Sequence, residues 1–206
     1  MKKEVSFILH PCFPKTGTTT FQNIINNLDV NILAKPSNYS KLPWFNFFKE
    51  ISNDKKNKKY KEIDINSTKI FLFKDYIKKK IRKDGEILVY SDEGFFGKHY
   101  YNLDNIIQLK DIIKEIEIEE DICFNLKLIF TIRNPVNYIK SNYNYFSSIN
   151  NKYTFKELIE NIQKNNIEVR KIFKTSNVIE FCSKNFSKKI LILPLELYIK
   201  EPKIYI

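Results

Sequence analysis

The chain has 206 residues, 43% of them hydrophobic, and this length is enough to bury one core. No repeat or linker divides it, so we expect a single domain over residues 1–206. Its 35 Lys and Arg residues against 24 Asp and Glu residues give a net charge of +11. This charge favours anionic partners (nucleotides, nucleic acids, acidic glycans or a membrane surface) without choosing among them, and a solvated lysine surface also accounts for much of it.

The cysteines indicate neither a disulfide framework nor a zinc site. Cys12, Cys123 and Cys182 are widely spaced, and none lies in a CxxC or Cys/His cluster. The apolar run over residues 5–9 is too short for a secretion signal or a membrane span. We therefore expect a cytoplasmic protein with no integral membrane segment and no metal.

Continuous apolar runs predict strands that are buried on both faces, at residues 5–9, 87–90, 126–132 and 190–193. Segments with helical spacing alternate with them, at residues 18–28, 68–82, 103–116, 136–147, 155–163 and 167–173, and the lysine-rich residues 53–62 are expected to form a loop. This alternation predicts an α/β fold of three layers, with a mostly parallel sheet flanked by helices. In such sheets, ligands bind beyond the carboxyl ends of the strands.

The sequence LHPCFPKTGTTTFQ, residues 9–22, leads from the first predicted strand into the first predicted helix. Gly17 precedes a helix start near Thr18 or Thr19, which leaves backbone N–H groups unpaired at the positive end of the helix dipole. With Lys15 nearby, the pattern predicts an anion-binding loop, although a threonine N-cap beside an incidental lysine also explains it. The lysine precedes the glycine, unlike in a Walker A loop, which disfavours an ordinary P-loop kinase or NTPase.

The string PKTGTTTFQ, after an apolar strand ending in histidine, resembles the 5′-phosphosulfate-binding loop of sulfotransferases that use 3′-phosphoadenosine-5′-phosphosulfate (PAPS). That loop is commonly P-K-[ST]-G-T-T, followed by an apolar helix. The resemblance implies a P-loop-like 5′-phosphosulfate-binding loop after the first strand, formed by Lys15, Thr16, Gly17, Thr18, Thr19 and Thr20.

The family's second motif is an arginine at the end of a central strand, with a serine eight residues later. LIFTIRNPVNYIKSNYNYF contains both, as Arg133 and Ser141. Pro135 suits the first turn of a helix, which places Ser141 about two turns along it. A guanidinium and a hydroxyl can together hold a compact dianion, and the resemblance assigns the 3′-phosphate of PAPS to this pair. Alternatively, Arg133 only ends a strand and Ser141 faces solvent.

ILVYSDEGFFGKH, residues 87–99, is typical of a buried strand that ends in acidic residues. In the family branch that includes the heparan sulfate sulfotransferases and many bacterial relatives, a glutamate in a similar place is the catalytic base, and the resemblance assigns this role to Glu93. Lys15 would stabilise the leaving phosphate oxygen. Asp92 is the competing carboxylate, and Glu93 could instead cap the next helix or pair with Lys98.

The two histidines leave alternatives open, because another branch of the family uses histidine as its base. His10, at the end of the first strand, either packs the loop or touches the acceptor, and His99 is expected on the surface. KKILILPLELYIKEP, residues 188–202, resembles the family's late strand and Glu-x-Leu segment. Family members usually continue for tens of residues, including a basic loop that closes over the nucleotide, so the domain is short at its C-terminus by comparison.

The resemblance implies a sulfotransferase that moves a sulfuryl group from PAPS to a hydroxyl or amine of an acceptor. The glutamate-type third motif favours a carbohydrate acceptor, and no nucleic-acid partner is implied. Two alternatives stay open. The short C-terminus would fit a degenerate sulfotransferase-like protein that binds the nucleotide without turnover. The charge would fit a basic nucleic-acid-binding module, although the aromatic residues lie in core-like runs instead of on one basic face.

Overall fold

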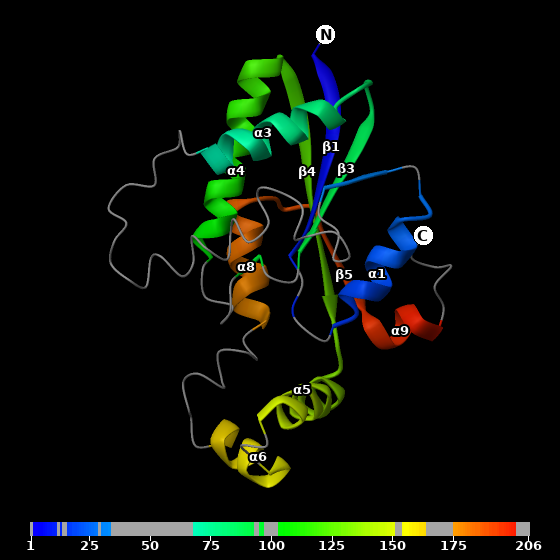
Figure 1. The fold of residues 1–206 in the computed structure, drawn as a ribbon, viewed down its shortest axis with the longest axis vertical. Helices are drawn as coiled ribbons and strands as arrows, with labels where there is room; N and C mark the ends of the chain where they lie inside the picture. Colours follow the sequence, from blue (N-terminus) through cyan, green and yellow to red (C-terminus); the bar gives the residue numbers. More distant parts are fainter. Residues whose placement is uncertain are drawn as a thin grey trace.

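A parallel sheet forms the centre of the molecule. The computed structural model describes residues 2–11, 13, 16–28, 30–33, 68–92, 95–96, 103–150, 154–163 and 175–200. All pairings in the five-stranded sheet are parallel, in the order β2-β3-β1-β4-β5 (Figure 1). The strands are β1 (Lys3–Pro11), β2 (Asn31–Ile32), β3 (Glu86–Asp92), β4 (Ile122–Ile132) and β5 (Ile190–Pro194). The predicted α/β class and the parallel sheet are confirmed.

Helices flank this sheet. Those described are α1 (Thr18–Ile25), α3 (Thr68–Lys80), α4 (Asp104–Glu120), α5 (Pro135–Asn150), α6 (Phe155–Gln163), α8 (Thr175–Asn185) and α9 (Leu195–Lys200). In Figure 1, α5 and α6 lie beyond the carboxyl end of β4, away from the other helices. The predicted helix at residues 167–173 and the predicted loop at 53–62 lie outside the described residues.

The two faces of the sheet bury different helices, because successive side chains of a strand point to opposite faces. On one face, Phe7 and Phe130 belong to the large hydrophobic core, together with apolar residues of α3, α4 and α8. On the other face, Val89 packs with Phe21 of α1. The sheet is therefore covered on both sides, which explains why its strands appear in the sequence as continuous apolar runs.

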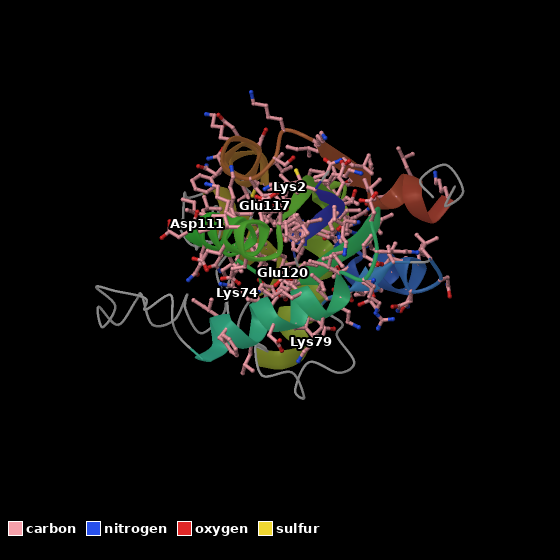
Figure 2. All side chains as sticks on the ribbon, turned by 90° about the horizontal axis from the view of Figure 1, so that it is seen from above. Lys2, Lys74, Lys79, Asp111, Glu117 and Glu120 are labelled. Carbon is pink, nitrogen blue, oxygen red and sulfur yellow. The ribbon has the colours of Figure 1, made fainter. Side chains whose placement is uncertain are left out.

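Part of the lysine charge is paired within the fold. Lys74 of α3 forms ion pairs with Glu115, at 3.0 Å, and with Glu119 of α4. Lys78, one turn further along α3, contacts Glu119 at 2.5 Å and Glu120 at 3.0 Å. Figure 2 shows these helices side by side, with Lys74 and Glu120 labelled. Such surface pairs contribute little stability individually, but they neutralise lysines that the net charge alone would leave available to partners.

Candidate functional site at the carboxyl ends of the strands

The connection from β1 to α1 turns sharply at Gly17. This residue is the N-cap of α1 and has a left-handed backbone, with φ +92° and ψ 25°, a conformation that glycine adopts without steric cost. The N–H of Phe21 donates to the carbonyl of Gly17 at 2.9 Å, which begins the helix ladder. Glycine has no side chain to cap the first turn of α1. The predicted helix start at Thr18 is confirmed.

The threonines around Gly17 have different environments. Thr16 is buried, and its hydroxyl donates to the carbonyl of Phe13 at 2.6 Å, so this group points into the protein. Thr18 is only 5% exposed, and its hydroxyl has no hydrogen-bond partner among the residues that the structure describes. Thr19 and Thr20 are exposed. Because a buried, unpaired hydroxyl is costly, Thr18 is the side chain here that a bound anion would satisfy.

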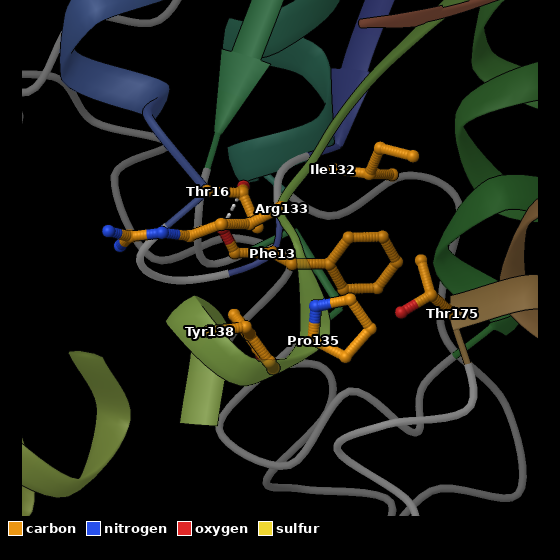
Figure 3. Close-up of a pocket in the computed structure, with 7 residues that line it drawn as sticks. All are labelled: Phe13, Thr16, Ile132, Arg133, Pro135, Tyr138 and Thr175. Carbon is orange, nitrogen blue, oxygen red and sulfur yellow. Dashed lines mark hydrogen bonds between the residues drawn. The ribbon is translucent and has the colours of Figure 1, made fainter. Parts of the chain in front are cut away.

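A cavity of about 100 Å³ lies where this loop meets the end of β4 (Figure 3). At roughly 30 Å³ per water, it could hold about three waters, or a group the size of a phosphate. The cavity brings together residues of the two sequence motifs, Thr16 and Arg133. The full lining is Phe13, Thr16, Ile132, Arg133, Pro135, Tyr138 and Thr175.

Arg133 directly follows β4, and its Nε lies 3.9 Å from a carboxylate oxygen of Glu196 in α9. In Figure 3, the Arg133 side chain extends away from the ring of Phe13. The two carboxylate oxygens of Glu196 also accept from the backbone N–H of Asn134, at 3.0 and 3.1 Å, and one accepts from the side-chain amide of Asn137, at 3.2 Å. Partial burial raises the pKa of Glu196, but these hydrogen bonds and the nearby guanidinium outweigh it and lower the pKa below its usual value.

Glu196 was not among the predicted site residues. It holds the turn that carries Arg133, and the adjacent Leu195 contacts Gly17. A β-carbon at residue 17 would collide with Cδ1 of Leu195, so the leucine packs directly on the glycine backbone. The first two residues of α9 thus contact both motif segments. The only signal in the sequence was Leu-Glu-Leu, residues 195–197, shortly after the last predicted strand.

Ser141 lies on α5, is partly exposed, and follows Asn137 by four residues and Tyr138 by three. Residues at these spacings are neighbours on one helix face. Ser141 is therefore one helical turn beyond Tyr138, which lines the cavity, and Asn137, which binds Glu196. The prediction that Arg133 ends a strand and Pro135 begins a helix is confirmed, and the shared role of Arg133 and Ser141 stays a prediction.

His10 is completely buried at the end of β1, within a polar network. Its Nδ1 lies 2.9 Å from the hydroxyl of Ser91, and its Nε2 lies 3.2 Å from the hydroxyl of Thr131. Its ring also packs on Phe21 of α1, with centroids 4.0 Å apart. Burial lowers the pKa of His10 to about 3. Of the two roles left open by the sequence, the geometry favours packing the loop over touching an acceptor.

Several predicted residues lie outside the described residues: Lys15, Glu93, His99 and Cys12. Asp92, the competing carboxylate, is partly buried and accepts a hydrogen bond from the hydroxyl of Tyr90 at 3.2 Å. Cys123 and Cys182 are free thiols, the first exposed and the second buried.

No protein-family model matches this chain, and no curated protein matches it significantly. Within the part of the chain that the structure describes, no helix is both long and apolar enough to cross a membrane. Among the same residues, no group of three or more His, Cys, Asp or Glu side chains could hold a metal ion. The fold and the site define a parallel α/β protein with a glycine-initiated helix and an arginine-bearing turn beside one small cavity.

Proposed function

We propose that this chain is a PAPS-dependent sulfotransferase that transfers a sulfuryl group to a hydroxyl or amine of a carbohydrate acceptor. The observation that carries the proposal is that Thr16 and Arg133, from motifs far apart in the sequence, line the same cavity. The cavity lies at the carboxyl ends of parallel strands, where such folds bind ligands.

The β1–α1 loop would hold the 5′-phosphosulfate. The left-handed backbone of Gly17 begins α1 without a capping side chain, so the first-turn N–H groups can donate hydrogen bonds to an anion. The buried hydroxyl of Thr18 adds a donor. Arg133 and Ser141 would bind the 3′-phosphate, the guanidinium supplying a planar set of donors.

The chemical step assigns roles that come from the family resemblance. Glu93 would take the proton from the acceptor as the acceptor oxygen or nitrogen attacks sulfur. The bond from sulfur to the 5′-phosphate oxygen would break, and Lys15 would stabilise the charge on that leaving oxygen. His10 is the less favoured base, because its ring has no exposed surface and both ring nitrogens have hydroxyl partners.

Calorimetric titration with 3′-phosphoadenosine-5′-phosphate (PAP), the desulfated product, tests the nucleotide site without knowledge of the acceptor. We expect PAP to bind, and adenosine 5′-phosphate to bind more weakly because it lacks the 3′-phosphate. Failure of PAP to bind would contradict the proposal. PAP binding without transfer from PAPS to any of a panel of sugar hydroxyl and amine acceptors would favour the degenerate, nucleotide-binding alternative.

A further inference from the structure

Three buried polar side chains lie at the ends of the three central strands, on the face that carries α1. They are His10 of β1, Ser91 of β3 and Thr131 of β4, and each is at most 1% exposed. Gln22 of α1 reaches them from the helix, and Thr16 reaches them from the loop. Buried polar groups are costly unless each is satisfied, so the direction of every hydrogen bond in this network matters.

The direction at the loop end follows from what each atom can donate. The carbonyl of Phe13 can only accept, so the hydroxyl hydrogen of Thr16 is committed to it, at 2.6 Å. In the 3.1 Å contact between the two threonine hydroxyls, Thr131 must therefore be the donor. Its single hydrogen is then used, so the 3.2 Å contact with His10 requires that Nε2 of the imidazole carries a hydrogen.

The hydrogen bonds at the helix end have a direction that is consistent with a hydrogen on Nε2 of His10. The amide nitrogen of Gln22 lies 3.2 Å from the backbone carbonyl of Ser91 and 3.0 Å from its hydroxyl. Since the carbonyl cannot donate, the nitrogen and not the oxygen of the amide must face Ser91. A neutral imidazole with its hydrogen on Nε2 has a lone pair on Nδ1, which accepts from the Ser91 hydroxyl at 2.9 Å. One chain of donors thus runs from Gln22 through Ser91, His10, Thr131 and Thr16 to the carbonyl of Phe13.

We propose that His10, as a neutral imidazole protonated on Nε2, and Thr131 are positioning residues that fix the β1–α1 loop relative to helix α1. This series of hydrogen bonds turns the Thr16 hydroxyl inward and holds the loop carbonyl of Phe13. At its other end, Gln22 connects the series to the helix. The start of α1, at Gly17 and Thr18, is thereby held in one orientation. The expected effect on ligand affinity rests on the proposed function. The direction of the hydrogen bonds from Gln22 to Phe13 does not.

The tautomer of His10 is the direct test. Long-range ¹⁵N–¹H correlation spectra of the ligand-free protein distinguish protonated from unprotonated ring nitrogens, and His10→Phe assigns the signals because only one other histidine is present. We expect hydrogen on Nε2 and none on Nδ1 between about pH 5 and about pH 8, where an ordinary histidine titrates. A hydrogen on Nδ1, or titration in that interval, would overturn the proposal.

Thr131→Val and Thr131→Ser are a matched pair for the positioning role. Valine keeps the shape but removes the hydroxyl, so Nε2–H loses its acceptor and Thr16 loses its donor. We expect the His10 tautomer and the backbone amide shifts of Thr16 and Gly17 to change with valine and to stay close to wild type with serine. Affinity for PAP should fall about tenfold with valine and stay within about twofold with serine.

The outcomes separate the two proposals. If wild-type protein does not bind PAP, the proposed function fails, while the tautomer and the amide shifts still decide whether the chain positions the loop. If wild type binds PAP and both Thr131 variants bind it equally well, the positioning role is wrong and the proposed function stands. Equal amide shifts of Thr16 in the two variants would also overturn the positioning role.

Discussion

Leu195 packs against Gly17 in the space that a β-carbon at residue 17 would fill. This contact joins the start of α9 to the start of α1, although the two residues lie near opposite ends of the chain. The same glycine has a left-handed backbone. Any other residue at position 17 would therefore face both a backbone strain and a collision.

Gly17→Ala should lower the free energy of unfolding by more than about 2 kcal/mol, because about 1–2 kcal/mol comes from the left-handed backbone alone. Gly85→Ala is the matched control, since Gly85 also has positive φ but no atom within 4 Å of an added β-carbon. Urea unfolding of both variants measures the difference. Equal losses in the two variants would show that Leu195 moves aside. If Leu195 does not move, the double variant Gly17→Ala with Leu195→Ala should be more stable than Gly17→Ala with the leucine in place.

Arg133→Ala should weaken PAP binding by about 2–4 kcal/mol, because it removes a charged donor from a phosphate. Adenosine 5′-phosphosulfate, which has no 3′-phosphate, should bind the variant almost as well as wild type. Arg82→Ala is the control, as Arg82 is an exposed arginine that follows α3. Calorimetry with the two ligands gives the comparison, and equal losses for both would remove Arg133 from the 3′-phosphate site.

Glu196→Ala should cost about 1 kcal/mol of unfolding free energy, the scale for a hydrogen bond to a backbone N–H at a helix start. The cost arises because the N–H of Asn134 and the amide of Asn137 lose their acceptor. Glu196→Gln keeps an acceptor and should cost less. Glu180, which forms an exposed pair with Lys184, supplies the control, and Glu180→Ala should cost less than Glu196→Ala because exposed ion pairs contribute little stability. Urea unfolding measures these costs, and equal losses of unfolding free energy in Glu196→Ala and Glu180→Ala would contradict the stabilising role of Glu196.

Acid should destabilise the protein through His10. The pKa is 6.5 for an ordinary histidine and about 3 for this buried one, so below pH 6.5 the unfolded chain binds a proton that the folded chain does not. Stability from the neutral ring is thus fully present above the unfolded pKa and is lost as the pH falls toward the folded pKa. At 1.36 kcal/mol per pH unit, the loss between pH 6.5 and pH 4.5 is about 2–3 kcal/mol.

His10→Gln isolates this contribution, because glutamine does not titrate and other acid-sensitive groups are unchanged. Unfolding free energies of both proteins, measured by urea denaturation between about pH 7 and about pH 4.5, should converge as the pH falls. Parallel curves would mean that the folded protein accepts a proton on His10.

The sequence predicted the strands and most helices because the sheet is buried on both faces, where long apolar runs are unambiguous. It missed β2, which has only two residues, and two helices: α8, which has 11 residues, and α9, a six-residue helix that begins directly after Pro194. Some predicted helix ends are also wrong: α4 continues to Glu120, beyond the predicted 116, and α5 continues to Asn150, beyond the predicted 147, whereas α6 ends at the predicted Gln163. Apolar spacing fades in polar final turns, so it does not mark these ends.

The site could be predicted in part. The strand-to-helix turn at Gly17 and the arginine after a strand were visible, because each depends on neighbours in sequence. The contact of Glu196 with the Arg133 turn was not, since the parallel pairing of β4 with β5 creates it. The inward direction of the Thr16 hydroxyl likewise depends on Thr131, far along the chain.

The place of β1 at the centre of the sheet has a consequence for how the protein reaches its native state. Val5 pairs with Glu86 on one side and with Phe124 on the other, so β1 can pair with β3 and β4 only after much of the chain that follows it has been synthesised. Closing such long loops costs entropy before any pairing returns it, and folds dominated by distant contacts fold slowly. The buried hydrogen-bond chain at the ends of β1, β3 and β4 can form only after those strands are aligned, so the candidate binding loop should be among the last parts to become ordered.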